Sequence, residues 1–429
     1  RGSPEGGVAD AADEIRRSVL ADLGGSDAAG MADPDRLRAA ATRAVEEYQR
    51  SARQAGRPLL HDPDAARDRV VRALTDLGAV SELLARDDVE EIFVEGARVS
   101  YLDRTGRLRG LVTPTTEAEN RRLVEQLLAT SDRQLHTASP LVQARVLGGA
   151  ARLTAAIPPV ADALSVTLRR YVVRAVTLRE LADRGSLDAR AATFLEAVMA
   201  FRSRVAVSGE PGAGKTTLLA ALLAAVPPEH CVRACEEIRE LAVPFTHGAY
   251  YETRPPALDG GGEISLRHLV KFVLAMRPDR IVVGEVRGAE AFELTRAVNA
   301  GCGFLCTVHA NSAPEALHAL VNAALMAGEN VTERVVQRVF SSALDLVVHV
   351  ERTGVDADRG GIRRVVTEIT AVVPALTDGF TCEPVFVRDH PDGPLRWTGV
   401  VPERLEQRAD RALGRPGGLR ALVEAGADR

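Results

Sequence analysis

The stretch from residue 209 to residue 217, Gly-Glu-Pro-Gly-Ala-Gly-Lys-Thr-Thr, fits the phosphate-binding pattern G-x-x-x-x-G-K-[ST] at every fixed position. The glycines let successive backbone N–H groups, together with the N-terminus of a following helix, surround phosphate groups. Lys215 would reach the β- and γ-phosphates, and the hydroxyl of Thr216 would ligate Mg²⁺. The candidate binding residues are Gly209, Glu210, Pro211, Gly212, Ala213, Gly214, Lys215, Thr216 and Thr217. The pattern predicts a site for ATP or GTP.

The flanking sequence supports this interpretation of the glycine-rich stretch. Residues 204–208, Arg-Val-Ala-Val-Ser, predict a buried strand, and residues 218–225, rich in leucine and alanine, predict a helix. The chain has 54 lysine and arginine residues, yet lysine occurs only at positions 215 and 271. A bulky guanidinium cannot replace a compact ammonium inside a phosphate-binding loop. The lysine in this loop therefore argues against an accidental match to the pattern.

Carboxylates follow two further apolar stretches of the same region. Residues 280–284 predict a strand that ends in Glu285, the place where an acid lies beside Mg²⁺ and the γ-phosphate. Residues 231–235 predict another strand, followed by Glu236 and Glu237. In a parallel sheet both strand ends lie at the edge that carries the phosphate loop. The alternative for Glu236 and Glu237 is a solvated strand end without a catalytic role.

The run from Arg277 to Ala291, followed by Thr-Val-His-Ala-Asn-Ser at 307–312, resembles the secretion-superfamily ATPases of type II and type IV secretion systems. Within that family the resemblance is closest to the branch that assembles tight-adherence (Flp-type) pili. Residues 252–256 and 263–271 are similar to that branch, as are residues 139–145 and 168–171. The resemblance covers roughly residues 80–375.

The resemblance implies roles for particular residues. Glu236 would polarise the attacking water, Glu285 would lie beside Mg²⁺, and His309 would sense the γ-phosphate. Arginines in family-like contexts would meet the γ-phosphate; the candidates are Arg169, Arg254, Arg267 and Arg277. This chain departs from the family at two places. It has Glu237 where Asp is usual, and residues 299–303 lack the first histidine of the family's histidine motif.

Composition excludes several other classes of protein. The formal net charge of −5 and the pI near 6.1 provide no global basic field for coating nucleic acid. No apolar run approaches the ~18 residues of a membrane span, and the acidic N-terminus does not resemble a signal peptide. Five cysteines in such a chain are expected to be reduced thiols, and those in apolar stretches should behave as small hydrophobes. We expect a soluble, cytoplasmic protein.

The order of predicted strands and helices indicates an α/β protein. We expect a small mixed α/β N-terminal domain followed by a RecA-like P-loop NTPase domain with a mainly parallel sheet, whose strands are 205–208, 231–235, 281–284, 303–308 and 345–350. The expected organisation is a variable, partly disordered helical region (1–60), the mixed domain (61–176), a linker (177–190), the ATPase domain (191–375) and a small C-terminal element (376–429).

The resemblance implies an ATP-hydrolysing homohexamer that requires Mg²⁺. It would be peripheral to the inner face of the cytoplasmic membrane, where membrane platform proteins would couple its hydrolysis to pilus assembly or protein secretion. Two alternatives stay open. One is a DNA-translocating motor of the conjugation type, although 4% aromatic residues and the lack of a basic, aromatic-containing run argue against direct nucleic-acid binding. The other is a nucleotide-dependent scaffold with little turnover.

Overall fold

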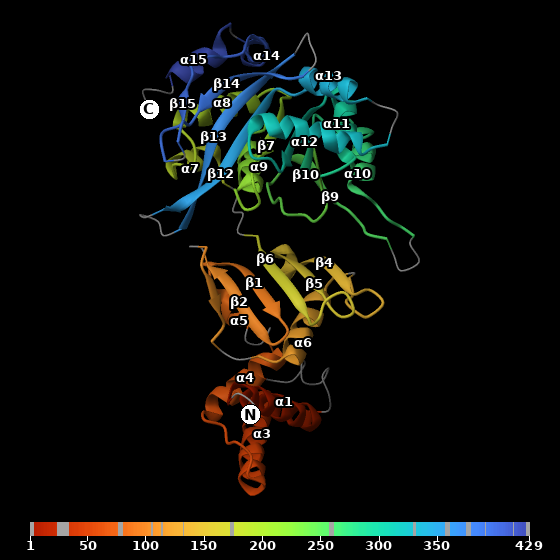
Figure 1. Cartoon of the computed structure of the whole chain (residues 1–429), viewed down its shortest axis with the longest axis vertical. Coiled ribbons are helices and arrows are strands. Elements are labelled where there is room, and N and C mark those ends of the chain that lie inside the picture. The colour runs from red at the N-terminus through yellow and green to blue at the C-terminus, as the bar shows by residue number, and fades with distance from the viewer. Residues whose placement is uncertain are drawn as a thin grey trace. The chain divides into compact units, whose positions relative to one another are not determined.

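Within the described residues of the computed structural model, the strands form two separate sheets, of six and nine strands (Figure 1). The structure describes residues 4–23, 34–75, 80–103, 106–112, 115–131, 133–171, 176–256, 261–328, 332–356, 361–374, 379–390, 392–414 and 416–425. The chain divides into two units, residues 1–172 and 173–429, each with its own core. The sequence-based boundary at residue 176 lies just beyond this division.

The N-terminal part of the first unit is helical. The helices are α1 (Pro4–Leu23), α3 (Pro34–Ala55) and α4 (Pro63–Thr75). Along α3 the buried residues Leu37, Ala41, Val45, Tyr48 and Ala52 recur at helical spacing, which places them on one face. This face packs against apolar residues of α1 and α4 in a small separate core. Helix α1 begins at Pro4, within the region that the sequence analysis expected to be partly disordered.

The rest of the first unit is an antiparallel sheet of order β3-β2-β1-β6-β5-β4. Its strands are β1 (Val89–Glu95), β2 (Arg98–Asp103), β3 (Leu108–Gly110), β4 (Leu141–Val146), β5 (Ala151–Ala156) and β6 (Ser165–Arg170), and its helices are α5 (Ser81–Ala85), α6 (Glu117–Leu128) and the 3-10 turn η2 (Leu147–Gly149). Gly148 and Gly149, with φ of +63° and +96°, allow a tight reversal between β4 and β5.

The second unit contains the nine-stranded sheet, of order β15-β14-β13-β12-β7-β11-β10-β8-β9. The strands are β7 (Arg204–Ser208), β8 (Cys231–Glu236), β9 (His247–Glu252), β10 (Arg280–Val286), β11 (Gly303–Val308), β12 (Leu346–Asp356), β13 (Gly361–Val373), β14 (Thr381–Val387) and β15 (Arg396–Trp397). The strands β12, β7, β11, β10, β8 and β9 follow one another in the sheet, and each pair of neighbours among them is parallel. The remaining pairs of the sheet are antiparallel. The five predicted strands are confirmed as β7, β8, β10, β11 and β12, and so is the mainly parallel α/β class.

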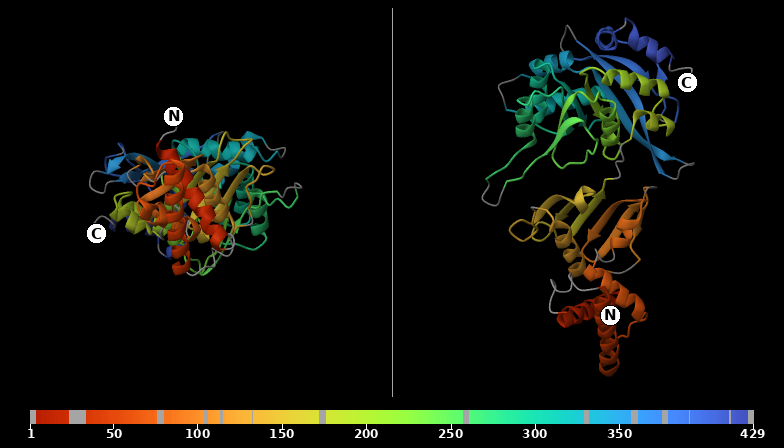
Figure 2. Two further views of the ribbon diagram at one scale, coloured as in Figure 1. Left: turned by 90° about the horizontal axis from the view of Figure 1, so that it is seen from below. Right: turned by 180° about the vertical axis from the view of Figure 1, so that it is seen from behind.

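Helices cover both faces of this sheet (Figure 2). They are α7 (Leu178–Asp183), α8 (Ala189–Met199), α9 (Lys215–Ala224), α10 (Leu266–Leu274), α11 (Glu290–Asn299), α12 (Ala313–Leu325), α13 (Glu333–Ala343), α14 (Glu403–Leu413) and α15 (Gly418–Ala425). Adjacent residues of β7 enter different cores. Val205 and Val207 pack with α8 and α9, whereas Ala206 packs with α11 and α12. Cys235 and Cys306 are core residues, and burial raises the pKa of each thiol to about 12.

The C-terminal residues belong to the second unit. The small C-terminal element expected from residue 376 onward adds β14 and β15 to the large sheet, and α14 and α15 pack on its core. Asp345 holds α14 against the rest of the second unit, because its fully buried carboxylate forms ion pairs with Arg408 and Arg404 of that helix. The Asp345 carboxylate also accepts a hydrogen bond from the backbone N–H of Arg204 at 2.9 Å, which ties α14 to the start of β7.

Candidate nucleotide site

The phosphate loop, residues 209–217, leaves the carboxyl end of β7 and enters α9. Its glycines meet specific steric demands. A Cβ on Gly209 would collide with the carbonyl oxygen of Val350 on the neighbouring β12. Gly214, at the N-cap of α9, has φ of +95°, which a larger residue adopts only with strain. The loop therefore joins the carboxyl end of β7 directly to the N-terminus of α9, where anions are favoured.

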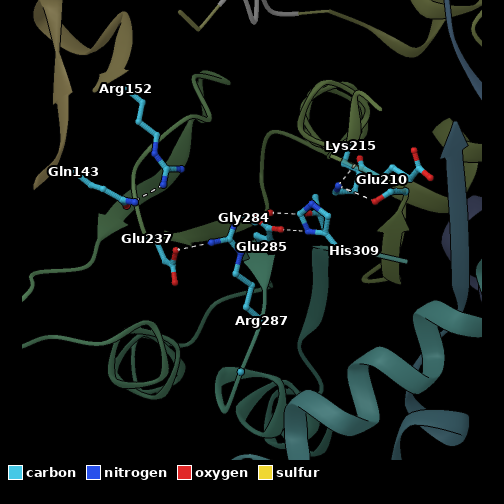
Figure 3. Close-up of polar contacts among 12 residues, drawn as sticks. Gln143, Arg152, Glu210, Lys215, Glu237, Gly284, Glu285, Arg287 and His309 are labelled. Carbon is cyan, nitrogen blue, oxygen red and sulfur yellow. Dashed lines mark hydrogen bonds and ion pairs between the residues drawn. The ribbon is translucent and has the colours of Figure 1, made fainter. Parts of the chain in front are cut away.

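The side chains of the loop fall into buried and exposed groups. Lys215 is 7% exposed, and its Nζ donates hydrogen bonds of 2.9 Å to the carbonyl oxygens of Gly209 and Glu210 (Figure 3). The ammonium is thus held inside the loop, at the first residue of α9. Thr216 and Thr217 are half-buried on the same helical turn, whereas Glu210 and Pro211 are exposed. This arrangement agrees with a phosphate-binding role for the loop.

Glu285 and His309 meet at the same edge of the sheet. Glu285 lies near the end of β10, and His309 follows β11, the strand between β10 and β7. Nδ1 of His309 contacts Oε1 of Glu285 (Figure 3). Burial lowers the pKa of His309, although Glu285 opposes the shift, so the imidazole is neutral near pH 7. A neutral imidazole meets a carboxylate favourably at Nδ1 only when that nitrogen carries the proton.

Arg287 links the acidic side chains beyond β10. Its Nη2 donates to Glu285 Oε2 at 2.6 Å, and its Nη1 lies 3.4 Å from Glu237 Oε2. The Glu237 side chain is 49% exposed, so its ion pair with Arg287 is solvated and weak. Arg287 was not among the site residues predicted from the sequence. Its position directly after the strand that carries Glu285 was nevertheless a usable signal.

Glu236 is buried at the end of β8. Its Oε1 accepts hydrogen bonds from the backbone N–H groups of Glu240 (3.0 Å) and Leu241 (3.2 Å), and its Oε2 has only a 3.4 Å contact with Leu241 N. Its Cγ lies 2.7 Å from the position that a Cβ on Gly284 would occupy. Burial raises the pKa of Glu236 to about 7, against the opposing effect of the two N–H groups. The side chain therefore lies beside β10, with one oxygen tied to its own loop.

The structure does not bring the candidate arginines of the second unit to the phosphate loop of the same chain. Arg254 donates from Nε to the carbonyl oxygen of Gly262 at 2.6 Å, and Arg267 donates to the buried carboxylate of Glu293 at 3.0 Å. Arg277 is exposed and precedes β10, so the length of that strand separates it from Glu285 by roughly 20 Å. Any contact of Arg277 with a γ-phosphate must involve another copy of the chain.

Arg169, the candidate arginine of the first unit, lies on β6. Its Nε is 3.5 Å from Glu91 Oε1 on the neighbouring β1, and its side chain is 50% exposed. An exposed ion pair at this distance contributes little to stability, so the pairing leaves the guanidinium available to other anions.

Two arginines that the sequence analysis did not consider lie against the phosphate loop. Arg364 on β13 donates from Nε to the carbonyl oxygen of Gly212 at 2.9 Å. Nη1 of Arg352, on β12, lies 3.8 Å from where a Cβ on Gly212 would be. Arg352 comes two residues after the predicted strand 345–350, at the carboxyl end where ligands bind, and that position was an available signal.

The residues at this edge fit a nucleotide together with Mg²⁺. Among the described residues no group of three or more His, Cys, Asp or Glu side chains could hold a metal ion. Mg²⁺ characteristically uses one or two protein oxygens and completes its shell with phosphates and waters. Thr216, on the first turn of α9, and Glu285 are the side chains that would hold it. No helix within the described ranges is long and apolar enough to cross a membrane.

A glycine loop with its lysine at a helix N-terminus, beside a strand that ends in a carboxylate, defines a P-loop nucleotide-binding protein. The chain belongs to the family of type II/IV secretion system proteins, which matches residues 75–365. A protein of Mycobacterium tuberculosis named for conjugal transfer is 36% identical over 301 residues, which cover 68% of this chain and 83% of that protein. The type IV secretion system protein PtlH of Bordetella pertussis is 30% identical over 334 residues, covering 71% and 96%.

A solved structure supports the fold. The pilus retraction motor PilT with bound ADP has a TM-score of 0.51 to this chain at 17% identity, covering 81% of this chain and 89% of PilT. At this identity the likeness concerns the fold alone, and the expected RecA-like fold after a smaller N-terminal domain is confirmed.

Proposed function

We propose that this protein is an Mg²⁺-dependent ATPase that works as a homohexameric motor for pilus assembly or protein secretion. One observation carries the proposal. Lys215, Glu285 and His309 lie together at the carboxyl ends of the parallel strands of one sheet. The family of secretion system proteins supplies the biological context. The tight-adherence branch is the part of the family that we favour, on the residues quoted from the sequence.

Each residue at this edge would have a distinct part in hydrolysis. The ammonium of Lys215 and the N-terminus of α9 would offset the negative charge of the phosphates as the γ-phosphoryl group leaves. Bound Mg²⁺ would neutralise further charge on the phosphate oxygens. Glu285 and Thr216 would orient that ion, and neutral His309 would hold the Glu285 carboxylate through Nδ1–H.

Glu236 is the proposed general base for the attacking water. A base works best when its pKa is near the operating pH, and burial raises the pKa of Glu236 to about 7. Its Oε1 already accepts two backbone N–H groups, so Oε2, with its single 3.4 Å contact, is the oxygen that would accept the proton. The alternative, a solvated strand end, fits Glu237 instead, because that side chain is half exposed.

The assembly would be a closed ring of six copies at the inner face of the cytoplasmic membrane, in contact with membrane platform proteins. Cyclic symmetry would let an arginine of one copy complete the site of the next. A DNA-translocating role remains the second candidate, because several relatives are named for conjugal transfer. We favour protein export, because the net charge of −5 offers no general attraction for DNA.

Steady-state hydrolysis by the purified protein tests the proposal. We expect Mg²⁺-dependent release of phosphate from ATP, and Lys215→Ala should abolish both release and ATP binding because the phosphates lose their ammonium. The matched control is Lys271→Ala, which removes the chain's other lysine from the exposed side of α10. ATP binding without turnover by the wild-type protein would instead support the scaffold alternative. Equal activity of the Lys215→Ala variant and the wild type would refute the assignment of the loop.

A further inference from the structure

We propose that Arg352 and Arg364, termed the arginine pair, bind the α-phosphate of the nucleotide from the same chain. The pair lies on the β12–β13 ribbon, far along the sequence from the phosphate loop. The inference rests on the proposed nucleotide site. It adds a second set of cations to that site, at the end of the phosphate chain opposite the γ-phosphate.

The β12–β13 ribbon brings the pair to the loop. β12 lies directly beside β7, with His349 opposite Ser208, the residue that precedes the loop. Ser208 Oγ and His349 Nδ1 are joined by a buried 2.9 Å hydrogen bond, which holds the two strands at this level. Both β12 and β13 are longer than β7, and their ribbon continues past the rest of the sheet (Figures 1 and 2).

The two arginines face the loop from one side of the ribbon. Arg352 and Arg364 are directly opposite each other in the antiparallel register, so their side chains project from the same face. Arg364 donates to the carbonyl oxygen of Gly212, and its Cδ lies 3.2 Å from where a Cβ on Gly214 would be. Arg352 Nη1 lies 3.8 Å from the position that a Cβ on Gly212 would occupy. The glycines thus leave space that the arginines reach.

Arg352 places a positive charge beside the phosphate loop. Like charges directly opposite each other in a sheet destabilise it. Within the part of the chain that the structure describes, no acidic side chain forms an ion pair with Arg352, which is exposed. The adjacent Glu351 is engaged elsewhere, because its Oε1 accepts a hydrogen bond from Thr367 Oγ1 at 3.0 Å. A bound phosphate would supply a counter-charge for the exposed Arg352 guanidinium.

Irregularities in the ribbon surround the pair. The register of β12 and β13 shifts between His349 and Val350, and again between Arg352 and Val355. Bulges of this kind re-aim side chains and are frequent next to active sites. Arg352 pairs with Arg364 in the short regular segment between the two bulges. The bulges on either side therefore fix the direction in which these two side chains point.

The strand order identifies which part of the nucleotide the pair meets. Glu285 and His309 lie on β10 and after β11, on one side of β7, and they mark the γ-phosphate end of the site. β12 and β13 lie on the other side of β7. A triphosphate chain that crosses the loop with its γ-phosphate at Glu285 therefore presents its α-phosphate to the arginine pair, where a guanidinium binds phosphate through two N–H groups.

Calorimetric titration of the full chain with ATP, ADP and inorganic tripolyphosphate, at fixed Mg²⁺, tests the proposal. Arg352→Gln should raise the Kd for all three ligands by about tenfold, because each of them places a phosphate at this position. Arg352→Lys should recover part of the loss. The control is Arg363→Gln, since Arg363 lies on the opposite face of β13, 3.4 Å from Asp392. Arg364→Gln is a second variant, which also removes the contact with Gly212.

The outcomes separate the possible roles. A loss of affinity confined to ATP would place the contact at the γ-phosphate and overturn the proposal. A loss for ATP and ADP but not for tripolyphosphate would indicate stacking on the base, and would also overturn it. Unchanged affinities in Arg352→Gln would remove Arg352 from the site while leaving the phosphate loop intact. A wild-type protein that binds none of the ligands would refute the proposed function itself.

Discussion

At the scale of single residues, the adjacent carboxylates of Glu236 and Glu237 occupy opposite environments. Glu236 is 4% exposed and lies against Gly284, whereas the Glu237 side chain is 49% exposed and ion-paired with Arg287. Glu236 is the last residue of β8, whereas Glu237 lies in the bend that follows the strand, so only Glu236 is held beside β10. The two residues therefore offer a matched pair for testing which carboxylate acts on water.

We expect Glu236→Gln to reduce turnover by at least about 100-fold while ATP affinity stays near that of the wild type, because a proton acceptor is lost and no phosphate contact is. Glu237→Gln should reduce turnover far less. Steady-state hydrolysis and nucleotide titration of both variants provide the measurement. If Glu237→Gln proved the more damaging substitution, the role of general base would pass to Glu237.

Glu236 should also make stability depend on pH. Its pKa is about 7 in the folded chain and near 4.5 when unfolded, so the fold favours the protonated form. This contribution is complete below pH 4.5 and is lost as pH rises through 7, by up to roughly 3 kcal/mol. Glu236→Gln should therefore be more stable than the wild type at pH 8, with a much smaller difference at pH 5. Thermal unfolding at both pH values measures this dependence.

At the scale of elements, the contact between β8 and β10 determines where Glu236 lies. The two strands are parallel neighbours, and their side chains alternate between the two faces of the sheet. Gly284 leaves room on β10 for the Glu236 side chain, whose Cγ would be 2.7 Å from an added Cβ. The absence of a side chain at one position of β10 is thus what lets a carboxylate from β8 remain at the site.

We expect Gly284→Ala to displace Glu236, lowering turnover at least tenfold and stability by about 1 to 3 kcal/mol, the usual cost of overpacking. The control is Gly110→Ala, because a Cβ at Gly110 meets nothing within 4 Å. Hydrolysis and chemical denaturation of both variants test the contact. Wild-type turnover in Gly284→Ala would show that the position of Glu236 does not limit catalysis.

At the scale of the whole molecule, the position of Arg277 bears on the proposed ring of several copies. Arg277 comes three residues before the amino end of β10. The phosphate loop follows the carboxyl end of β7, and the parallel strands β7 and β10 have their carboxyl ends on the same side of the sheet. A rigid sheet cannot bring the amino end of β10 to that side. If Arg277 contacts a γ-phosphate, it must do so in a neighbouring copy, as the proposed ring allows.

Mixing inactive variants tests this arrangement. Lys215→Ala and Arg277→Ala proteins should each be nearly inactive alone, the first in ATP binding and the second in turnover only. Mixed rings should recover up to about a quarter of wild-type activity, because random assembly places an intact loop beside an intact Arg277 at one interface in four. Failure to recover activity in rings of confirmed mixed composition would show that Arg277 does not act between copies.

The sequence alone determined the features that depend on neighbouring residues. The phosphate loop requires glycines, a lysine and a hydroxyl at set spacing between a strand and a helix, and β7, residues 209–217 and α9 have that arrangement. The five core strands of the parallel sheet were predictable because continuous apolar runs are needed where both faces are covered. Glu285 was predictable because it ends one of these runs.

Tertiary structure alone decided which distant residues meet. The order β12-β7-β11-β10-β8 places Arg352 and Arg364 on one side of the phosphate loop and Glu285 with His309 on the other. Strand order, register and bulges arise from packing between segments far apart in the chain, and no local pattern encodes them. For the same reason the sequence did not reveal that Arg267 pairs with buried Glu293, or that Arg277 lies at the far edge of the sheet.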